Sequence, residues 1–308
     1  MAIAITTRHL RALLAVAEAG STAGAARSLH LSQPSVSVAV QELEAILGQA
    51  LFQRLPARGL VPTAFGLRKL AEARALASAL SAFEAGDGQV GTPAGHVAFG
   101  YFSTLGPQYV PAVLRRMAAA YPKVSVSIHE GDLGELNRLL AAGRIELALT
   151  YDVELGAGIA AEAVGELRPY ALLPARHALA ARTAVTVADL AAEPFILVDL
   201  PLSREFLLSP FRAAGIEPRV AYRAPSLEMV FGLVANGLGV SLLVTRREGD
   251  LAYDGRRVVR RPLEGSAMRQ GVVIARAEGI APTAPARALA ECIRAEIAGV
   301  RPAPAGRP

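Results

Sequence analysis

The stretch STAGAARSLHLSQPSVSVAVQELEAILG (residues 21–48) decides the fold of the first part of this chain. Residues 21–29 predict a short helix with small side chains on one face, a tight connection follows, and residues 32–48 predict a second helix. Ser32 suits the N-cap of that second helix, and Pro34 lies in its first turn, where proline is tolerated. The major groove of DNA is about 12 Å wide and admits one helix, whose N-terminal residues meet the base edges. The stretch therefore predicts a helix-turn-helix that binds DNA.

The flanking residues extend this unit on both sides. Upstream, four apolar residues recur at helical spacing, and Gly20 suits the C-cap of the helix that they predict. Downstream, RLPARGLVPT (residues 54–63) predicts a wing, which is two short extended arms around a Pro/Gly turn. We therefore expect an α-helical winged helix-turn-helix over residues 1–62. The apolar residues are Leu10, Leu13, Leu14 and Ala17.

Candidate DNA contacts lie at the start of the second motif helix and in the wing. The amide of Gln33 can pair with adenine, and the short side chains around it permit close approach to the groove. Arginines of the wing suit phosphate or minor-groove contact. Capping alone remains an alternative role for Ser32, as does solvent exposure for Gln41 and the arginines. The predicted DNA contacts are Ser32, Gln33, Pro34, Ser35, Ser37, Gln41, Arg54 and Arg58.

A long helix is predicted from Thr63 to about Gly86, followed by a Gly- and Pro-rich joint. Its apolar stripe must be buried against something. A partner chain's helix is one candidate, as in a coiled-coil dimer, and packing on the chain's own domains is the other. We expect residues 63–92 to form a linker helix and hinge, with dimerisation through Leu67, Leu70, Ala77 and Leu80.

From residue 93 to residue 300, short apolar strands alternate with amphipathic helices. Examples are the strand expected at 97–101, the helix at 107–120 and the strand at 124–129. This alternation predicts an α/β domain with a mainly parallel sheet. The tail 301–308 is rich in Pro, Ala and Gly, and we expect it to be frayed and disordered.

Composition narrows the function further. The chain has 308 residues and a net charge of +5, but residues 1–90 hold eight Lys/Arg against six Asp/Glu, so the DNA prediction rests on the motif. One cysteine, Cys292, allows no disulfide, and the five histidines lack metal-ligand spacing, so we predict no metal and no cofactor. No catalytic motif appears, so we predict that the chain is not an enzyme. The sequence shows no signal peptide and no apolar run of about 18 residues, which predicts a cytoplasmic protein without a membrane partner.

Residues 8–66 resemble the winged helix-turn-helix of LysR-type transcriptional regulators. Residues 93–300 resemble the effector domain of that family, which is a periplasmic-binding-protein-like pair of α/β lobes. Val38 departs from the pattern, because the family often has a basic residue there. The matching residues of the first part are Ala25-Ala26, residues 32–37, Leu43-Glu44, Leu47-Gly48, Leu51-Phe52, Arg54, Thr63 and Gly66, and those of the second part are residues 143–148 and 233–240.

The resemblance implies an architecture and a set of partners. It places a two-lobed effector-binding α/β domain at 93–300, joined to the DNA-binding domain by the long linker helix. Lobe I is expected at about 93–163 and 267–300, and lobe II at about 164–266. The implied partners are a double-stranded, pseudo-palindromic DNA operator, a small-molecule effector and further copies of the chain as a dimer and homotetramer, with RNA polymerase as a candidate.

The effector is expected in the cleft between the lobes, at the carboxyl ends of strands. Hydroxyl groups at 103–104 and the helix start after them favour a polar or anionic ligand group, with helix capping as the alternative. Arg204 could pair with a ligand carboxylate, or with Glu205 or Asp199. The resemblance adds contacts at Thr104, near Asp132, at 201–203 and near Ser226. The predicted effector residues are Ser103, Thr104, Gly131, Asp132, Leu133, Tyr151, Asp152, Pro201, Leu202, Ser203, Arg204 and Ser226.

Together these patterns predict a LysR-type DNA-binding transcriptional regulator. A small molecule in the cleft would favour one lobe arrangement and so shift the spacing of paired DNA-binding heads. Two alternatives stay open. One is a solute-binding or enzymatic α/β protein, and the other is a regulator with a vestigial effector pocket.

Overall fold

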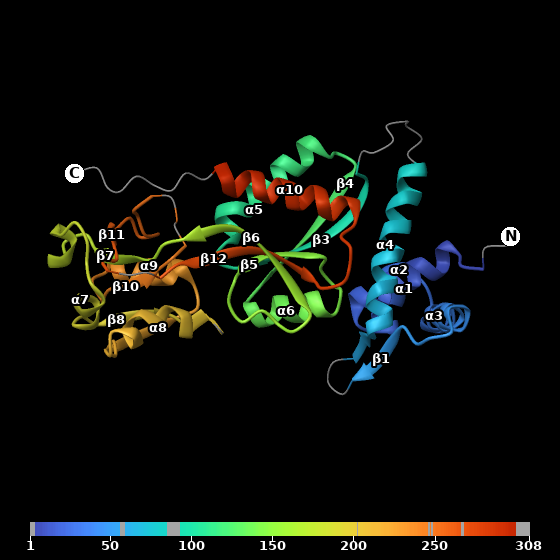
Figure 1. Cartoon of the computed structure of the whole chain (residues 1–308), viewed down its shortest axis with the longest axis horizontal. Helices are drawn as coiled ribbons and strands as arrows, with labels where there is room; N and C mark the ends of the chain where they lie inside the picture. Colours follow the sequence, from blue (N-terminus) through green and yellow to red (C-terminus); the bar gives the residue numbers. More distant parts are fainter. Residues whose placement is uncertain are drawn as a thin grey trace.

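The computed structural model describes residues 4–55, 59–84, 93–201, 203–245, 247, 249–265 and 268–299. These residues form three parts that follow one another along the longest axis of the molecule (Figure 1). Some predictions fall outside the described residues, namely those for Arg58, Leu202, the hinge at 85–92 and the tail at 301–308.

The first part is a helical head with a small wing. Helix α1 ends at Gly20, whose φ of 65° places it in the left-handed region, and α2 begins at its N-cap Ser21. The wing strands β1 and β2 pair antiparallel, as the winged helix-turn-helix prediction requires. The elements are α1 (Thr7–Ala19), α2 (Thr22–Leu29), α3 (Gln33–Leu47), β1 (Phe52–Leu55), β2 (Gly59–Pro62) and the linker helix α4 (Ala64–Glu84).

The second part, lobe I, is a five-stranded sheet in the order β4-β3-β5-β12-β6. Helices α5 and α10 lie on one face of this sheet and α6 lies on the other (Figure 1). Strand β3 pairs parallel with β4 and β5, whereas β12 pairs antiparallel with β5 and β6. The elements are β3 (Gly95–Phe102), α5 (Gly106–Ala120), β4 (Val124–Gly131), α6 (Leu133–Ala141), β5 (Leu147–Tyr151), β6 (Ile159–Leu167), β12 (Gln270–Ala277) and α10 (Ala284–Gly299).

The third part, lobe II, contains a three-stranded antiparallel sheet, β10-β7-β11, and a parallel pair, β8-β9. A parallel bridge between Phe195 and Val240 connects the two. The elements are β7 (Tyr170–Pro174), the 3-10 helix η1 (Ala178–Ala181), α7 (Val187–Ala191), β8 (Phe195–Val198), α8 (Ser203–Ala213), β9 (Val220–Ala224), α9 (Leu227–Ala235), β10 (Ser241–Leu243) and β11 (Val258–Pro262).

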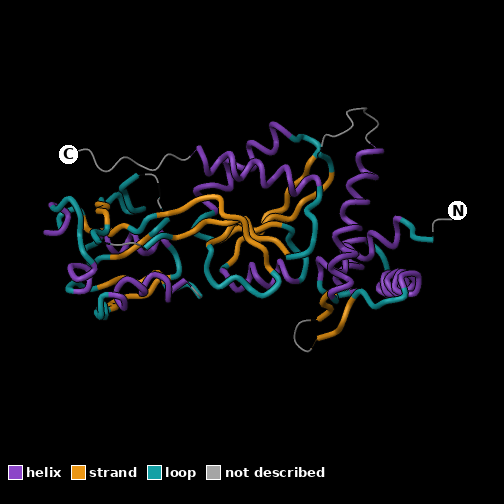
Figure 2. The backbone as a smooth tube through the Cα atoms, in the orientation of Figure 1, coloured by secondary structure: helices purple, strands orange, loops and turns teal. Residues whose placement is uncertain are grey.

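The α/β class is confirmed, but the expectation of a mainly parallel sheet is wrong, because the sheets are mixed. Strands β6 and β12 carry the chain out of lobe I and back, so they run in opposite directions and pair antiparallel. Both strands extend between the central sheet and lobe II (Figure 2). Strand β6 continues to Leu167, so the lobe boundary expected at residue 163 falls inside a strand.

Each lobe has its own hydrophobic core, and Leu200 and Phe206 pack against both cores. These two residues therefore mark the junction between the lobes. Within the described part of the chain, no helix is both long enough and apolar enough to cross a membrane.

Candidate functional site

The turn between α2 and α3 is defined by one residue in the left-handed conformation and one side-chain cap. His30 adopts a φ of 55° and ends α2, a left-handed conformation that few residues other than glycine take. Ser32 then caps α3, because its Oγ accepts a hydrogen bond from the backbone N–H of Ser35 at 3.3 Å. The predicted capping role of Ser32 is confirmed, and the cap leaves the first turn of α3 at the surface.

The first turn of α3 presents its polar side chains to solvent. Gln33 is exposed, and its Nε2 donates one long hydrogen bond of 3.4 Å to Thr22 Oγ1. Ser37 is half-buried. The exposed predicted DNA contacts are Ser32, Gln33, Pro34, Ser35, Gln41 and Arg54.

Several motif residues of the head have structural roles. The carboxylate of Glu44 accepts hydrogen bonds from the backbone N–H groups of Leu51 (2.7 Å) and Phe52 (3.3 Å), which fixes the chain between α3 and the wing. Thr63 Oγ1 donates to the carbonyl oxygen of Ala50 at 2.8 Å. A Cβ on Gly66 would lie 2.0 Å from the carbonyl oxygen of Leu51, so only glycine permits this approach. These contacts hold the wing and α4 in place beside α3.

The linker helix α4 packs partly on its own chain, which corrects the expected dimerisation stripe. Leu70 is fully buried in the head core, where it packs with Leu13, Leu43 and Leu51. It therefore cannot face a partner helix in this structure. Leu67 and Ala77 are half-buried, and Leu80 is 36% exposed.

Helix α4 also contacts lobe I. Arg74 donates a hydrogen bond from Nη2 to the carbonyl oxygen of Gly143, in the turn between α6 and β5. A Cβ on Gly143, whose φ is 61°, would meet Leu67 at 3.1 Å. Burial raises the pKa of the Glu146 carboxyl above its ordinary value, and the nearby Arg74 opposes this rise. Glu146 also accepts a hydrogen bond from Thr283 Oγ1 at 3.2 Å, which ties the same turn to the start of α10.

A cavity of about 30 Å³ lies between the two lobes. Side chains of β5 and α6 line it from lobe I, and side chains of α8, α9 and β10 line it from lobe II. Its polar lining residues are Thr104, Tyr151, Thr245 and Gln270, and its apolar lining residues are Phe102, Leu133, Val153, Val198, Leu200, Phe206, Leu207, Leu227, Leu243 and Val244.

Three hydroxyl groups, here called the hydroxyl cluster, bridge the lobes at this cavity. Thr104 Oγ1 and the Tyr151 hydroxyl of lobe I lie 2.8 Å apart. Thr245 of lobe II contacts both, bonding directly to Tyr151 and donating to Thr104 at 3.2 Å. Burial raises the pKa of Tyr151 to about 12, so its hydroxyl stays protonated at neutral pH. The cluster is therefore a neutral hydrogen-bonded contact between lobes.

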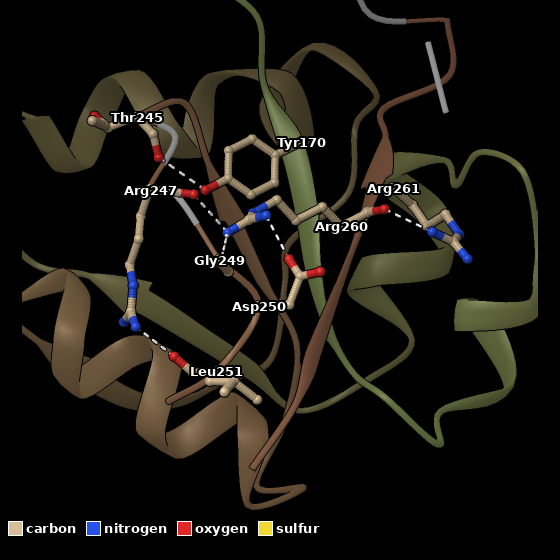
Figure 3. Close-up of polar contacts among 8 residues, drawn as sticks. All are labelled: Tyr170, Thr245, Arg247, Gly249, Asp250, Leu251, Arg260 and Arg261. Atoms are coloured by element: carbon tan, nitrogen blue, oxygen red, sulfur yellow. Dashed lines mark hydrogen bonds and ion pairs between the residues drawn. The ribbon is translucent and has the colours of Figure 1, made fainter. Parts of the chain in front are cut away.

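The segment after Thr245 is held by Arg260, as Figure 3 shows. The guanidinium group of Arg260 donates to Asp250 (2.6 Å), and to the carbonyl oxygens of Arg247 (2.8 Å) and Gly249 (2.5 Å). The hydroxyl of Tyr170 donates to the carbonyl oxygen of Thr245 at 2.8 Å. These bonds fix the backbone that presents Thr245 to lobe I.

Of the predicted effector residues, the structure brings Thr104, Leu133 and Tyr151 to the cavity. Asp132 and Ser226 instead cap α6 and α9 by accepting N–H bonds from Glu135 (2.8 Å) and Met229 (3.1 Å). The backbone N–H of Asp152 donates to Gly271 at 3.0 Å, and its side chain is exposed. Outside the cavity lining lie Ser103, Gly131, Asp132, Asp152, Pro201, Arg204 and Ser226, and the side chain of Ser203 is outside the described part.

Arg204 forms an ion pair with Asp199 (3.0 Å), so of the two acidic partners considered, the structure selects Asp199. Glu205 pairs instead with Arg212. Gln270 and Thr245, both of which line the cavity, were not predicted from the sequence. The one available signal was the position of Thr245 directly after the apolar residues 242–244.

Comparison with known proteins covers nearly the whole chain. Residues 7–67 match the bacterial regulatory helix-turn-helix proteins of the lysR family, and residues 91–298 match the LysR substrate binding domain. The transcriptional activator protein LysR of Escherichia coli (strain K12) is 30% identical over 269 residues, which are 84% of this chain and 83% of that protein.

Two solved structures extend the likeness to three dimensions. HinK, a LysR family transcriptional regulator from Pseudomonas aeruginosa, is 35% identical, with a TM-score of 0.65 over 95% of this chain and 98% of its own. Full-length CbnR complexed with its target DNA is 26% identical, with a TM-score of 0.57 over 95% of this chain and 100% of its own.

Proposed function

The chain belongs to the LysR family of DNA-binding transcriptional regulators, and we propose that a small molecule held between its two lobes controls how it binds an operator. The family consists of regulators with an effector-binding domain, so the prediction of a regulator rather than an enzyme stands. The observation that carries the proposal is the cavity between the lobes, because the hydroxyl cluster at its wall joins lobe I to lobe II.

The proposed DNA surface is the first turn of α3 together with the wing. Gln33 is the proposed base reader, since its amide is exposed and its one hydrogen bond to another described residue is long, at 3.4 Å. Arg54 and Arg58 are proposed to bind phosphates or the minor groove. The remaining proposed contacts are Ser32, Pro34, Ser35, Ser37 and Gln41.

The functional unit is proposed to be a dimer of dimers, which pairs the heads on a pseudo-palindromic operator. The exposed residues of α4 are the proposed seam, and Leu76 (55% exposed) and Leu80 (36% exposed) lie four residues apart on one helix face. RNA polymerase is a further proposed partner. A cytoplasmic location, where bacterial DNA lies, follows from this proposal.

Ligand control is proposed to work by a population shift. A ligand can shift the lobe equilibrium only through a difference in its affinity for the two arrangements. Here that difference would come from the hydroxyl cluster, which a ligand must rearrange, because the cavity of about 30 Å³ has room for about one water molecule. The Arg74–Gly143 contact would then pass a movement of lobe I to α4 and the heads.

The experiment has two steps. Genomic DNA fragments bound by the purified protein are first selected and footprinted, which yields an operator. Operator affinity is then measured with and without each compound that raises the melting temperature. We expect a paired, two-fold footprint and a change of affinity or footprint spacing with at least one compound. A footprint that no stabilising compound alters would support the vestigial-pocket alternative and contradict the proposal.

A further inference from the structure

We propose that the effector is an uncharged, mainly apolar molecule, and that the side-chain amide of Gln270 is the residue that selects it. This inference rests on the proposed function, because it concerns the ligand of the same cavity. It replaces the expectation of an anionic ligand, which came from the hydroxyl groups at 103–104 and from Arg204.

The cavity wall carries no charged side chain among the described residues that line it. An ionised ligand would leave water without gaining a counter-charge, which costs several kcal/mol in an apolar site. The charged groups nearest in sequence are already satisfied or face solvent. Arg204 is paired with Asp199 and its side chain is 45% exposed, and Asp152 is exposed. The wall thus disfavours a carboxylate or phosphate.

Gln270 offers a donor and an acceptor inside this apolar wall. It is 3% exposed and begins β12, one of the two strands that connect the lobes. Among described residues, its side-chain amide makes one hydrogen bond, a long one of 3.3 Å from Nε2 to the carbonyl oxygen of Gly271. Buried amides normally have several good partners. Because Gln270 lines the cavity, a ligand amide, lactam or neutral heterocycle bound there would satisfy the remaining bonding capacity of its side chain.

The rest of the wall suits the apolar part of such a ligand. Phe206, Leu200 and Leu227 of lobe II line the cavity together with Phe102 and Leu133 of lobe I. A cavity of about 30 Å³ holds no organic molecule, so the lobes must part before the ligand enters. The apolar area of the opened walls is then covered again by the ligand, and the hydroxyls of the cluster become donors for its polar end.

The test uses matched neutral and anionic probes. Benzamide is compared with benzoate, phenylacetamide with phenylacetate, and indole-3-acetamide with indole-3-acetate, by calorimetric titration of the full-length protein. Within the pairs that bind, we expect the amide to bind at least about tenfold more tightly than the carboxylate. Tighter binding of the carboxylates, or no binding by any of the six probes, would overturn the inference.

The variant Gln270→Leu assigns the selection to this residue. Leucine keeps most of the volume and removes both hydrogen-bonding groups, so amide affinity should fall about tenfold or more. The melting temperature of the ligand-free variant checks that it folds, and Gln270→Asn, which restores an amide, should recover part of the affinity. Unchanged amide affinity in a folded Gln270→Leu would overturn the role of Gln270.

Operator binding separates this inference from the proposed function. Carboxylates that bind preferentially and change operator affinity would overturn the uncharged-effector inference and leave the proposed function standing. Amides that bind through Gln270 but leave operator affinity unchanged would support the inference about the cavity and contradict the proposed control of DNA binding.

Discussion

Arg74 of the linker helix donates a hydrogen bond to the backbone carbonyl oxygen of Gly143 in lobe I. The two residues come from different parts of the chain, and the contact is the most direct polar link between α4 and the effector-binding part among the described hydrogen bonds. Gly143 adopts a φ of 61° and packs on Leu67, so the turn fits closely against the helix. This contact therefore joins the linker helix to lobe I.

Removing the Arg74 side chain should loosen that turn. Arg74→Met keeps an apolar stem but leaves the Gly143 carbonyl without its donor, so amide hydrogen exchange at residues 142–146 should speed up. Arg68→Met is the matched control, because Arg68 is exposed and its hydrogen bond to another described residue stays within α4, to the carbonyl oxygen of Ala64 at 3.4 Å. Equal exchange in the two variants would show that the contact does not hold the turn.

Glu146, which lies near the Arg74–Gly143 contact, makes the stability of the folded protein depend on pH. Burial raises its pKa, so the folded protein holds the Glu146 proton at pH values where the unfolded chain, with a pKa of about 4.3, has lost it. The resulting stability is fully present below about pH 4.3 and is lost as the pH rises through the raised pKa. We expect the free energy of unfolding of wild type, minus that of Glu146→Gln, to fall over this range in urea titrations. A difference that rises with pH would contradict the assignment.

Two leucines of the linker helix should behave in opposite ways. Leu70 is fully buried in the head core, so Leu70→Ala should destabilise the protein by about 2–5 kcal/mol. Leu80 is 36% exposed, and Leu80→Ala should change the stability of the protomer by no more than about 0.5 kcal/mol. Chemical denaturation of both variants tests the burial of Leu70, and similar losses for the two would refute it.

The exposed face of α4 is the place to test assembly. Leu76→Asp and Leu80→Asp put a charge where the proposed helix seam would exclude water, so they should weaken oligomerisation and, through lost bivalency, operator binding. Sedimentation equilibrium of wild type and variants measures this directly. A wild type that sediments as a monomer, or a doubly substituted variant that stays fully oligomeric, would rule out this seam.

Base reading by Gln33 can be tested by comparing binding to the selected operator with binding to random DNA. Gln33→Ala should cost about 1–3 kcal/mol on the selected operator and much less on random DNA, because phosphate contacts remain. Titrations at one salt concentration on both DNAs suffice. Equal losses on the two would mean that Gln33 contributes to affinity without reading sequence.

The head was predictable from sequence because its signals are local. Caps such as Ser32 and Gly20 mark helix ends within a few residues, and the structure uses both of them as expected. The predicted dimerisation stripe was wrong at Leu70, because the burial of this residue depends on contacts that are not local in the sequence. The spacing of Leu70 on α4 shows that it is apolar and on one face, but only the folded head shows that its partners are Leu13 and Leu51.

Two strands of the α/β part escaped prediction. Strand β6 consists largely of Ala, Glu and Gly, which are weak strand formers, and it exists because β12 pairs with it about a hundred residues later in the chain. Strand β11 carries Arg260 and Arg261, whose bonds to backbone carbonyls form only in the folded lobe. Neither the long-range pairing of β6 nor the arginine bonds of β11 produces a local sequence pattern that predicts a strand.

The lining of the cavity between the lobes was predictable from the sequence where strand ends decide it. Thr104 and Tyr151 follow or end strands of one sheet, and both line the cavity. Gln270 and Thr245 were not predicted because they reach the cavity only where the chain crosses between the lobes, and no local sequence pattern shows that crossing. Asp132 and Ser226 sit at strand-to-helix turns as expected, but helix capping uses their side chains.

The most direct test of the account is the ligand dependence of operator binding in wild type and Thr104→Val. Fluorescence anisotropy of a labelled operator is followed during titration with the tightest-binding probe. We predict an affinity change of about fivefold or more in wild type. In Thr104→Val the same change should need about ten- to a hundredfold more ligand. Identical ligand dependence in the two proteins would contradict the account, because the cavity between the lobes would then not be the site that controls DNA binding.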